Sequence, residues 1–208
     1  MTLNRPFSCL LLCLAIAAGS WCESTHAQER ERLISPIRSG VQPTMIFPGG
    51  AYAPTNLVLV EVIEFKHAGV SVTPGKPFRA DEDWLTNLTV RVKNISDRPL
   101  PHISMSFGLP EAKFVKDGRQ YSMGLTLAHK VGARMKENDR EMKAVMPGEE
   151  VELFCLNCSL EFREIANRTG VTSITLVNSG GDVSVFFEDG GRWMGSNLQI
   201  RAAAKPNP

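Results

Sequence analysis

The sequence predicts a mainly β protein: an antiparallel β-sandwich of about eight strands with one short helix. Two observations lead to this fold class. Short runs between residues 57 and 200 alternate apolar and polar side chains with a period of two, and polar turn residues separate them, which is typical of half-buried strands. Only one segment, residues 159–170, has the 3.6-residue period of an amphipathic helix.

The start of the chain, residues 1–27, is predicted to be a secretory signal peptide. Arg5 gives it a positive start, residues 7–19 form an apolar run, and small residues precede a cleavage site after Ala27. An uncleaved signal anchor is the alternative, but the chain has no apolar stretch long enough to span a bilayer. We therefore expect an exported mature chain, periplasmic or extracellular, without a membrane span after cleavage.

Cleavage after Ala27 would remove three of the five cysteines and leave only Cys155 and Cys158. Two cysteines do not make a disulfide framework, so a hydrophobic core must hold the domain together. The whole chain has 23 basic and 22 acidic residues, a formal net charge of +1. This balance offers no electrostatic footprint for nucleic acid, and we expect no nucleic-acid partner.

The mature chain is predicted to consist of an arm, one domain and a tail. Residues 28–56 contain four prolines and a glycine pair but no sustained period, which predicts an extended linker or arm. The folded domain is predicted to span residues 57–201, because the first sustained apolar run begins at Leu57. Residues 202–208 are predicted to be a disordered tail.

The elements of the domain follow from their patterns. In the strand predicted at residues 87–94, Leu88, Val90 and Val92 fall on one face and polar residues fall on the other. The helix has Ser159 as its predicted cap and ends before Gly170. The other predicted strands are residues 57–66, 102–109, 120–128, 150–156, 171–177, 182–188 and 192–200.

Three stretches carry a resemblance to a known type of domain: "VRVKNISDRPLPHISMSF", "MPGEEVEL" and "VSVFFEDGGRWMG". They are similar to stretches of exported bacterial proteins of immunoglobulin-like β-sandwich type, many of them uncharacterised. The resemblance spans residues 57–200 and implies an immunoglobulin-like sandwich but no activity. Its motifs are turns, which are built from Asn94, Asp97 and Pro99, from Pro147 and Gly148, and from Asp189 and Gly190.

The C-x-x-C pair follows a predicted strand and opens the predicted helix, and three interpretations remain open for it. Redox chemistry is one, since a helix N-terminus lowers a thiol pKa, but no proline between Pro147 and Pro206 could match the cis-proline of thioredoxins. A metal site is another, but His67, His102 and His129 follow no ligand spacing. We favour a structural pair, either a local disulfide or two reduced thiols.

Catalytic signals are weak elsewhere in the chain. The sequence has no G-x-S-x-G, H-E-x-x-H, Walker or G-x-G-x-x-G motif. His102 lies near serines and could act as a base, and Glu188 and Asp189 could be paired carboxylates. An outward-facing strand histidine and a hairpin turn at Asp189 and Gly190 are the simpler interpretations. We expect no catalytic residue, no metal and no cofactor.

These observations favour an exported, non-catalytic β-sandwich module that binds another exported protein or an envelope component. The alternative is an exported thiol-disulfide or metal-handling protein that uses Cys155 and Cys158. The two functions differ in their chemistry. The first needs an exposed binding surface, whereas the second needs a cysteine pair that reacts or holds a metal.

Overall fold

The computed structural model describes residues 29–36, 42–129, 144–155, 158–178 and 183–195. The predicted signal peptide and the predicted C-terminal tail lie outside these residues. Within them the protein is mainly β, with thirteen strands and one helix. No helix in these ranges is long and apolar enough to cross a membrane. The prediction of a mainly β fold is therefore confirmed, whereas the predicted number of about eight strands is too low.

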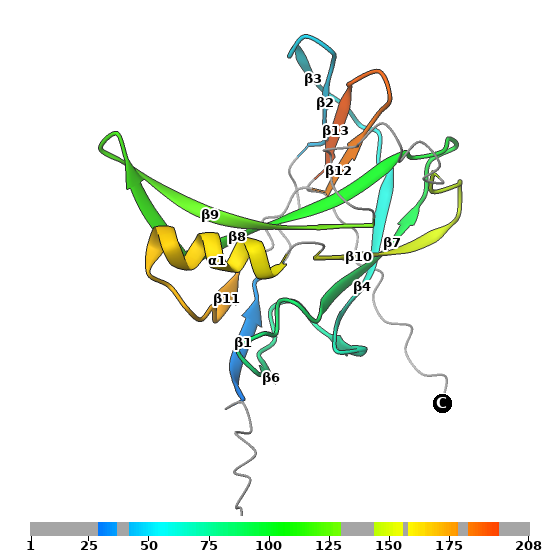
Figure 1. Ribbon diagram of the computed structural model, residues 1–208. Helices are drawn as coiled ribbons and strands as arrows, with labels where there is room; N and C mark the ends of the chain where they lie inside the picture. Colours follow the sequence, from blue (N-terminus) through cyan, green and yellow to red (C-terminus); the bar gives the residue numbers. More distant parts are fainter. Residues whose placement is uncertain (1–28, 37–41, 130–143, 156–157, 179–182, 196–208) are drawn as a thin grey trace, which may run out of the picture.

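Ten strands form one large sheet in the order β3-β2-β13-β12-β8-β9-β10-β7-β4-β5, and each paired neighbour is antiparallel. Figure 1 shows the long β8–β9 hairpin crossing the molecule, with β2, β3, β12 and β13 rising from it. The bounds are β2 Thr44–Ile46, β3 Tyr52–Pro54, β4 Val60–His67, β5 Val70–Val72, β7 Leu88–Asn94, β8 His102–Lys116, β9 Arg119–Ala128, β10 Glu150–Phe154, β12 Val183–Phe186 and β13 Arg192–Gly195.

A second, three-stranded sheet joins the large one. Its order is β11 (Leu176–Val177), β1 (Arg30–Ile34) and β6 (Phe78–Ala80). Strand β1 pairs with β11 in parallel and with β6 antiparallel. Just beyond β11, Asn178 forms a bridge to Gly108 of β8 through two backbone hydrogen bonds of 2.8 and 3.1 Å. The small sheet is thereby tied to the middle of the large one.

The period of two predicted from the sequence decides which side chains enter the core. In β7 the side chains of Leu88, Val90 and Val92 are fully buried, and the residues between them are partly exposed. In β8 the alternate residues from Ile103 to Leu109 are buried in the same way. These faces meet in the core, where the rings of Phe65 and Phe107 pack edge to face at 6.3 Å.

Residues 28–56, predicted to be an extended arm, contain three strands: β1, β2 and β3. Within β1 the side chains of Arg32 and Ile34 are 0% and 1% exposed, so the ordered part of the chain starts well before the boundary predicted at Leu57. Strands of three to five residues are too short to show a period, and prolines separate them. The sequence pattern therefore could not distinguish them from a linker.

The turn predicted around Asn94 is held by that side chain. Its Oδ1 accepts hydrogen bonds from the backbone N–H of Ser96 at 2.9 Å and from the Ser96 hydroxyl at 2.7 Å. Its Nδ2 donates to the carbonyl oxygens of Arg98 and Val145 at 2.8 and 2.9 Å. Asn94 is fully buried, so all of its polar groups must find such partners.

Asp189 and Gly190 lie in the turn between β12 and β13. Gly190 has a φ of +83°, a backbone conformation that glycine adopts without a Cβ clash. The carboxylate of Asp189 accepts a hydrogen bond from the N–H of Gly191 at 2.7 Å, and the N–H of Phe187 donates to the Gly191 carbonyl at 2.9 Å. Local turn chemistry of this kind is readable from the sequence.

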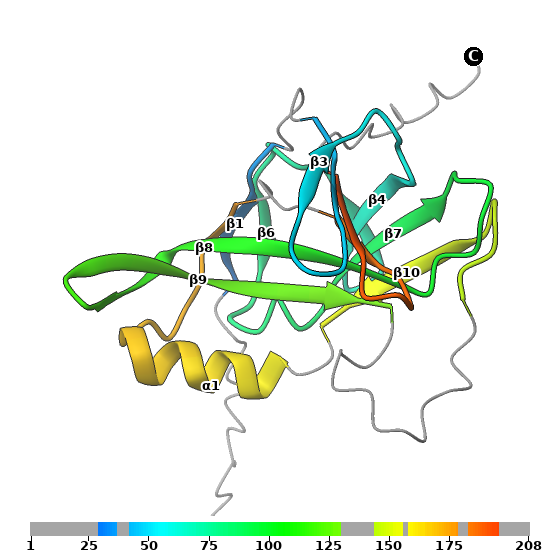
Figure 2. The same ribbon diagram turned by 90° about the horizontal axis from the view of Figure 1, so that it is seen from above.

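Helix α1 spans Cys158–Thr169, so it begins one residue before the predicted cap. Its apolar side carries Ile165, which is 1% exposed, into the core. Gly170 follows the helix with a φ of +72°, and its N–H donates to the Ala166 carbonyl at 2.8 Å. Figure 2 shows α1 lying alongside the β8–β9 hairpin, which it covers on one side.

The β8–β9 hairpin is longer than the two strands that the sequence predicts. Strand β8 continues to Lys116, and the turn consists of Asp117 and Gly118, with φ angles of +51° and +71°. An Asp-Gly pair with positive φ at both residues is the preferred two-residue hairpin turn. The period of β8 is broken by a register shift between Leu109 and Lys113. Because the shift interrupts the alternation, the sequence pattern did not predict that the strand continues beyond Leu109.

Candidate functional site

Cys155 and Cys158 form a disulfide bond at the junction between β10 and α1. Their Cα atoms are 5.4 Å apart, and Cys158, the first residue of α1, is 6% exposed. The sulfur of Cys158 lies 3.8 Å from the carbonyl oxygen of Leu85, just before β7. The bond therefore ties the end of a strand to the start of the helix, against the core.

The three histidines considered as metal ligands do not form one cluster. His102 and His129 lie together, with ring centroids 5.6 Å apart, and the His102 ring also contacts Phe186 at 5.5 Å. His67 is at the end of β4, where its ring contacts Phe78 at 5.7 Å. In the ranges that the structure describes, no three His, Cys, Asp or Glu side chains are grouped to hold a metal ion.

Two open grooves lie beside the small sheet. The larger, about 630 Å³, runs between α1 and residues 82–86, with an apolar floor that includes Leu85 and Phe162 and a charged rim that includes Asp83 and Arg163. The smaller, about 420 Å³, contains His67 and Ser71. The Ser71 hydroxyl donates to the carboxylate of Glu64 at 2.9 Å, so its hydrogen bond is not directed at the histidine.

On the outer face of β4, β7 and β10, charged side chains are matched with one another. Lys66 lies 3.2 Å from Glu64 and 3.1 Å from Glu152, and Arg91 lies 2.9 Å from Glu64. Burial raises the pKa of Glu64, but hydrogen bonds from Ser71 and Lys66 and the charge of Arg91 outweigh it, so the pKa is lowered overall. Lys66 and Arg91 on this face therefore already have carboxylate partners within the protein.

The outer half of the β8–β9 hairpin differs from that face. It extends past α1 and ends in the Asp117–Gly118 turn (Figures 1 and 2). The rings of Phe114 and Tyr121 stack across the two strands at 5.5 Å, and the guanidinium of Arg168 from α1 lies 5.8 Å from the centre of the Phe114 ring. The hairpin tip thus carries a stacked aromatic pair that is partly open to solvent.

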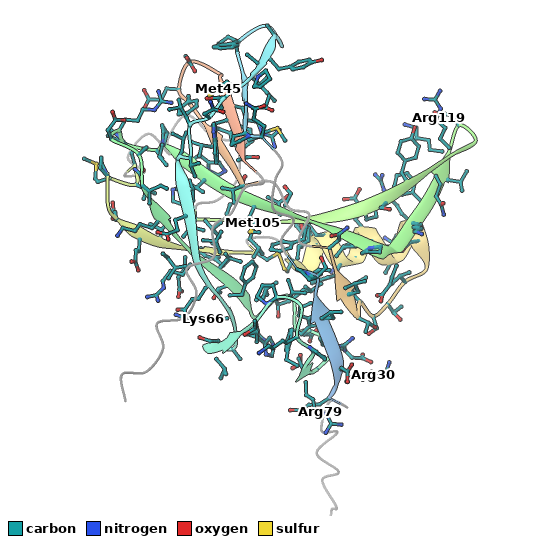
Figure 3. All side chains as sticks on the ribbon, turned by 180° about the vertical axis from the view of Figure 1, so that it is seen from behind. Arg30, Met45, Lys66, Arg79, Met105 and Arg119 are labelled. Carbon is teal, nitrogen blue, oxygen red and sulfur yellow. A yellow bond between two sulfur atoms is a disulfide. The ribbon has the colours of Figure 1, made fainter. Side chains whose placement is uncertain are left out.

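The cations at this tip have no anionic partner in the part of the chain that the structure describes. Lys116 and Arg119 are exposed and form a directly opposed cross-strand pair next to the turn. Phe114 and Tyr121 are the next pair on the same face, because side chains two residues apart share a face. We call these four residues, Phe114, Lys116, Arg119 and Tyr121, the tip patch; Figure 3 shows Arg119 at the far end of the hairpin.

On the side away from β8, α1 lies beside the inner half of β9, and toward the hairpin tip β9 has no paired strand among the described residues. Strand β9 pairs with β8 along its whole length, but in the described chain it pairs with β10 only at Ala128. The carboxyl group of Glu161 in α1 lies near the backbone N–H of Thr126, and this N–H lowers the pKa of the carboxyl group. Because backbone direction alternates along a strand, Gly124 and Ser122 must point their N–H and C=O groups the same way as Thr126, and both residues are exposed.

Glu161 marks the place where α1 meets this edge. Burial raises the pKa of its carboxyl group, the hydrogen bond from the Thr126 N–H lowers it in part, and the nearby charge of Glu164 raises it further, so that the pKa is raised overall. A half-buried carboxylate at this position blocks strand pairing at Thr126. Beyond it, toward Arg119, the edge of β9 has no such cap among the described residues.

Sequence reasoning missed this region because it treated residues 110–119 as a connection between two strands. The available signal was the Asp117–Gly118 pair between Val115 and Tyr121, which is a hairpin signature. No family model, no curated protein and no solved structure matches this chain. Its own geometry is therefore the basis for a functional proposal.

Proposed function

We propose that this chain is an exported, non-catalytic module of immunoglobulin-like sandwich type, and that it binds an exported or envelope protein through the β8–β9 hairpin. The observation that carries the proposal is the tip patch at the end of a projecting hairpin. It brings together two aromatic rings and two cations that have no anionic partner among the described residues. Aromatic residues and arginine are enriched where proteins bind one another.

The exposure of this region argues for a role beyond folding. Tyr121 is 42% exposed and Val115 is 71% exposed, yet the inner halves of their strands carry buried side chains such as Phe107 and Leu127. The tip extends beyond the core, so its side chains contribute little to the burial that stabilises the domain. A projecting arm of this kind gives a partner access without disturbing the core.

Two features support export. Residues 1–27 have the pattern of a secretory signal peptide. Cys155 and Cys158 are bonded, and disulfide bonds persist in oxidising compartments such as the periplasm. The type of sandwich is supported by the turn motifs of residues 57–200, which resemble those of immunoglobulin-like domains.

Site-specific photocrosslinking in the native envelope tests the proposal. A benzophenone amino acid in place of Tyr121 should capture a partner protein after irradiation, because this side chain lies in the tip patch. The matched control replaces Tyr52, which is 77% exposed on β3 and lies on a different part of the sheet. Equal capture at both positions, or no capture at Tyr121, would refute binding through the hairpin.

Thiol-disulfide exchange is the second candidate, because the bonded pair lies at a helix start. Reactive pairs of this kind expose the attacking cysteine at the helix N-terminus. Here the residue at that position is the second cysteine, Cys158, and it is buried. Replacing Cys158 by Ala would trap mixed disulfides through Cys155 in an exchange protein, whereas we expect none for a structural bond.

A further inference from the structure

We infer that the partner contributes an acidic, extended segment that adds as a strand to the outer edge of β9, with its carboxylates against Lys116 and Arg119. This inference rests on the proposed function and specifies the chemistry of the partner. Three features of the hairpin carry it: the charges of the tip patch, the open backbone edge, and the small apolar area at the tip.

The charges at the tip are arranged unfavourably for the isolated protein. Lys116 and Arg119 are direct cross-strand partners, and like charges at such positions repel each other. Asp117 lies in the turn between them, but it forms no ion pair with either side chain in the described chain. A carboxylate from outside would remove the repulsion and pair with both cations.

Two partly buried cations on the face of β4, β7 and β10 contrast with this pair. Lys66 and Arg91 each lie within 3.2 Å of a carboxylate, so an acidic partner would have to displace an existing ion pair there. At the tip, no ion pair among the residues that the structure describes would have to be displaced. Charge complementarity therefore directs an acidic segment to the hairpin end rather than to the face of β4, β7 and β10.

The edge of β9 supplies the backbone hydrogen bonds. Arg119 pairs with Lys116 directly across the two-residue turn, so its N–H and C=O groups face β8. Because backbone direction alternates along a strand, the N–H and C=O groups of Gln120, Ser122 and Gly124 point away from β8. All three residues are exposed. An extended peptide can pair with such an edge, and the main-chain hydrogen bonds then provide affinity while the side chains provide specificity.

A protein segment fits this site better than a lipid surface does. Val115 points to the opposite face from Phe114, and the Phe114 ring is already covered by Tyr121 and Arg168. Little apolar area is left to enter a bilayer. Lipid headgroups would use the cations but not the row of backbone donors along β9, whereas an acidic peptide would use both.

Binding of a defined peptide to the full exported chain tests the inference. The probe is a fluorescein-labelled peptide that alternates Glu and Val, and the readout is fluorescence anisotropy at low and at high salt. We expect this peptide to bind and a peptide that alternates Lys and Val not to bind. Anionic vesicles of phosphatidylcholine and phosphatidylglycerol are tested in parallel.

Two variants separate charge from backbone pairing. The double change Lys116→Glu with Arg119→Glu should weaken binding by about tenfold or more, because each change replaces an attraction with a repulsion. The matched control, Lys76→Glu with Arg79→Glu, makes the same charge change at exposed sites far from the tip, as the place of Arg79 in Figure 3 shows. We expect this control to have a much smaller effect.

The second variant, Ser122→Pro, removes one outward N–H, which an edge strand tolerates. This variant should bind the acidic peptide more weakly. Methylation of alternate backbone nitrogens of the peptide should also weaken binding, because it removes the peptide's own N–H donors. Unfolding curves establish that each variant is folded. The inference is overturned if the acidic peptide does not bind, or if the tip variant and the control variant lose peptide binding equally. It is also overturned if the protein binds the anionic vesicles but not the peptide. Capture at Tyr121 would then still support the proposed function, so the two failures are distinguishable.

Discussion

Arg32 and Arg119 are the same side chain in two regions that accommodate a positive charge in different ways. Arg32, in β1, is fully buried and donates to the Ser173 hydroxyl at 3.2 Å and to the carbonyl oxygens of Ile174 and Asp81, each at 2.8 Å. Arg119, at the start of β9, is exposed and has no anionic partner in the described chain.

The first region uses its charge to join segments that are distant in the sequence. Ile174 follows α1 by only a few residues, and its carbonyl oxygen also accepts the indole N–H of Trp84 at 2.7 Å. Arg32 thus connects β1 with the segments before β7 and β11. A buried guanidinium is costly unless its donors are satisfied, and here two carbonyl oxygens and the Ser173 hydroxyl accept hydrogen bonds from its terminal nitrogens.

In the second region, the hairpin tip, the positive charge of Arg119 is available to an external partner. Nothing in the described chain depends on the positive charge of Arg119, and the opposed Lys116 makes the arrangement slightly unfavourable. Position in the fold, and not residue type, therefore decides whether an arginine stabilises the protein or remains available for binding. This difference also predicts that changes in the two regions should separate stability from binding.

The largest effect is expected for Arg32→Ala. Loss of its hydrogen bonds and the cavity left behind should lower the free energy of unfolding by about 3 kcal/mol, measured by urea denaturation. The matched change Arg119→Ala should stay within about 0.5 kcal/mol, because an exposed side chain without partners is removed. Similar losses for both variants would show that the buried hydrogen bonds of Arg32 do not stabilise the fold.

A smaller effect is expected for Gly118→Val in the turn of the β8–β9 hairpin. Gly118 has a φ of +71°, which a β-branched residue adopts only with strain, so unfolding should become easier by about 1 kcal/mol. Gln120→Val introduces the same side chain at an exposed strand position nearby and should be nearly neutral. If Gly118→Val is equally neutral, the hairpin does not use this turn.

The smallest effect is expected for Lys116→Glu, and it should be favourable. The change turns a repulsive cross-strand pair into an attractive one with Arg119, so stability should rise by about 0.5 kcal/mol at low salt. The gain should shrink at high salt, because exposed charges are screened. Urea denaturation at two salt concentrations measures both quantities, and a loss of stability would show that Lys116 has a stabilising partner at the tip.

Part of this fold is local in origin and was therefore predictable. The alternation in β7 and in the first half of β8 determines which side chains are buried, since a period of two assigns each residue to a face. The turns at Asn94 and at Asp189 and Gly190 are held by side-chain hydrogen bonds within a few residues, to which Asn94 adds one distant bond, to the Val145 carbonyl. Helix α1 follows from its own amphipathic pattern.

The remaining features depend on contacts between distant segments. Strand β1 exists because β6 and β11 pair with it and because Arg32 finds acceptors at Asp81 and Ile174, and a five-residue stretch carries no sign of either. The candidate site has the same origin. A basic residue in the sequence does not show whether it has a partner; only the tertiary structure matched Lys66 and Arg91 with carboxylates and left Arg119 without one, since its neighbours in space are chosen by strand order.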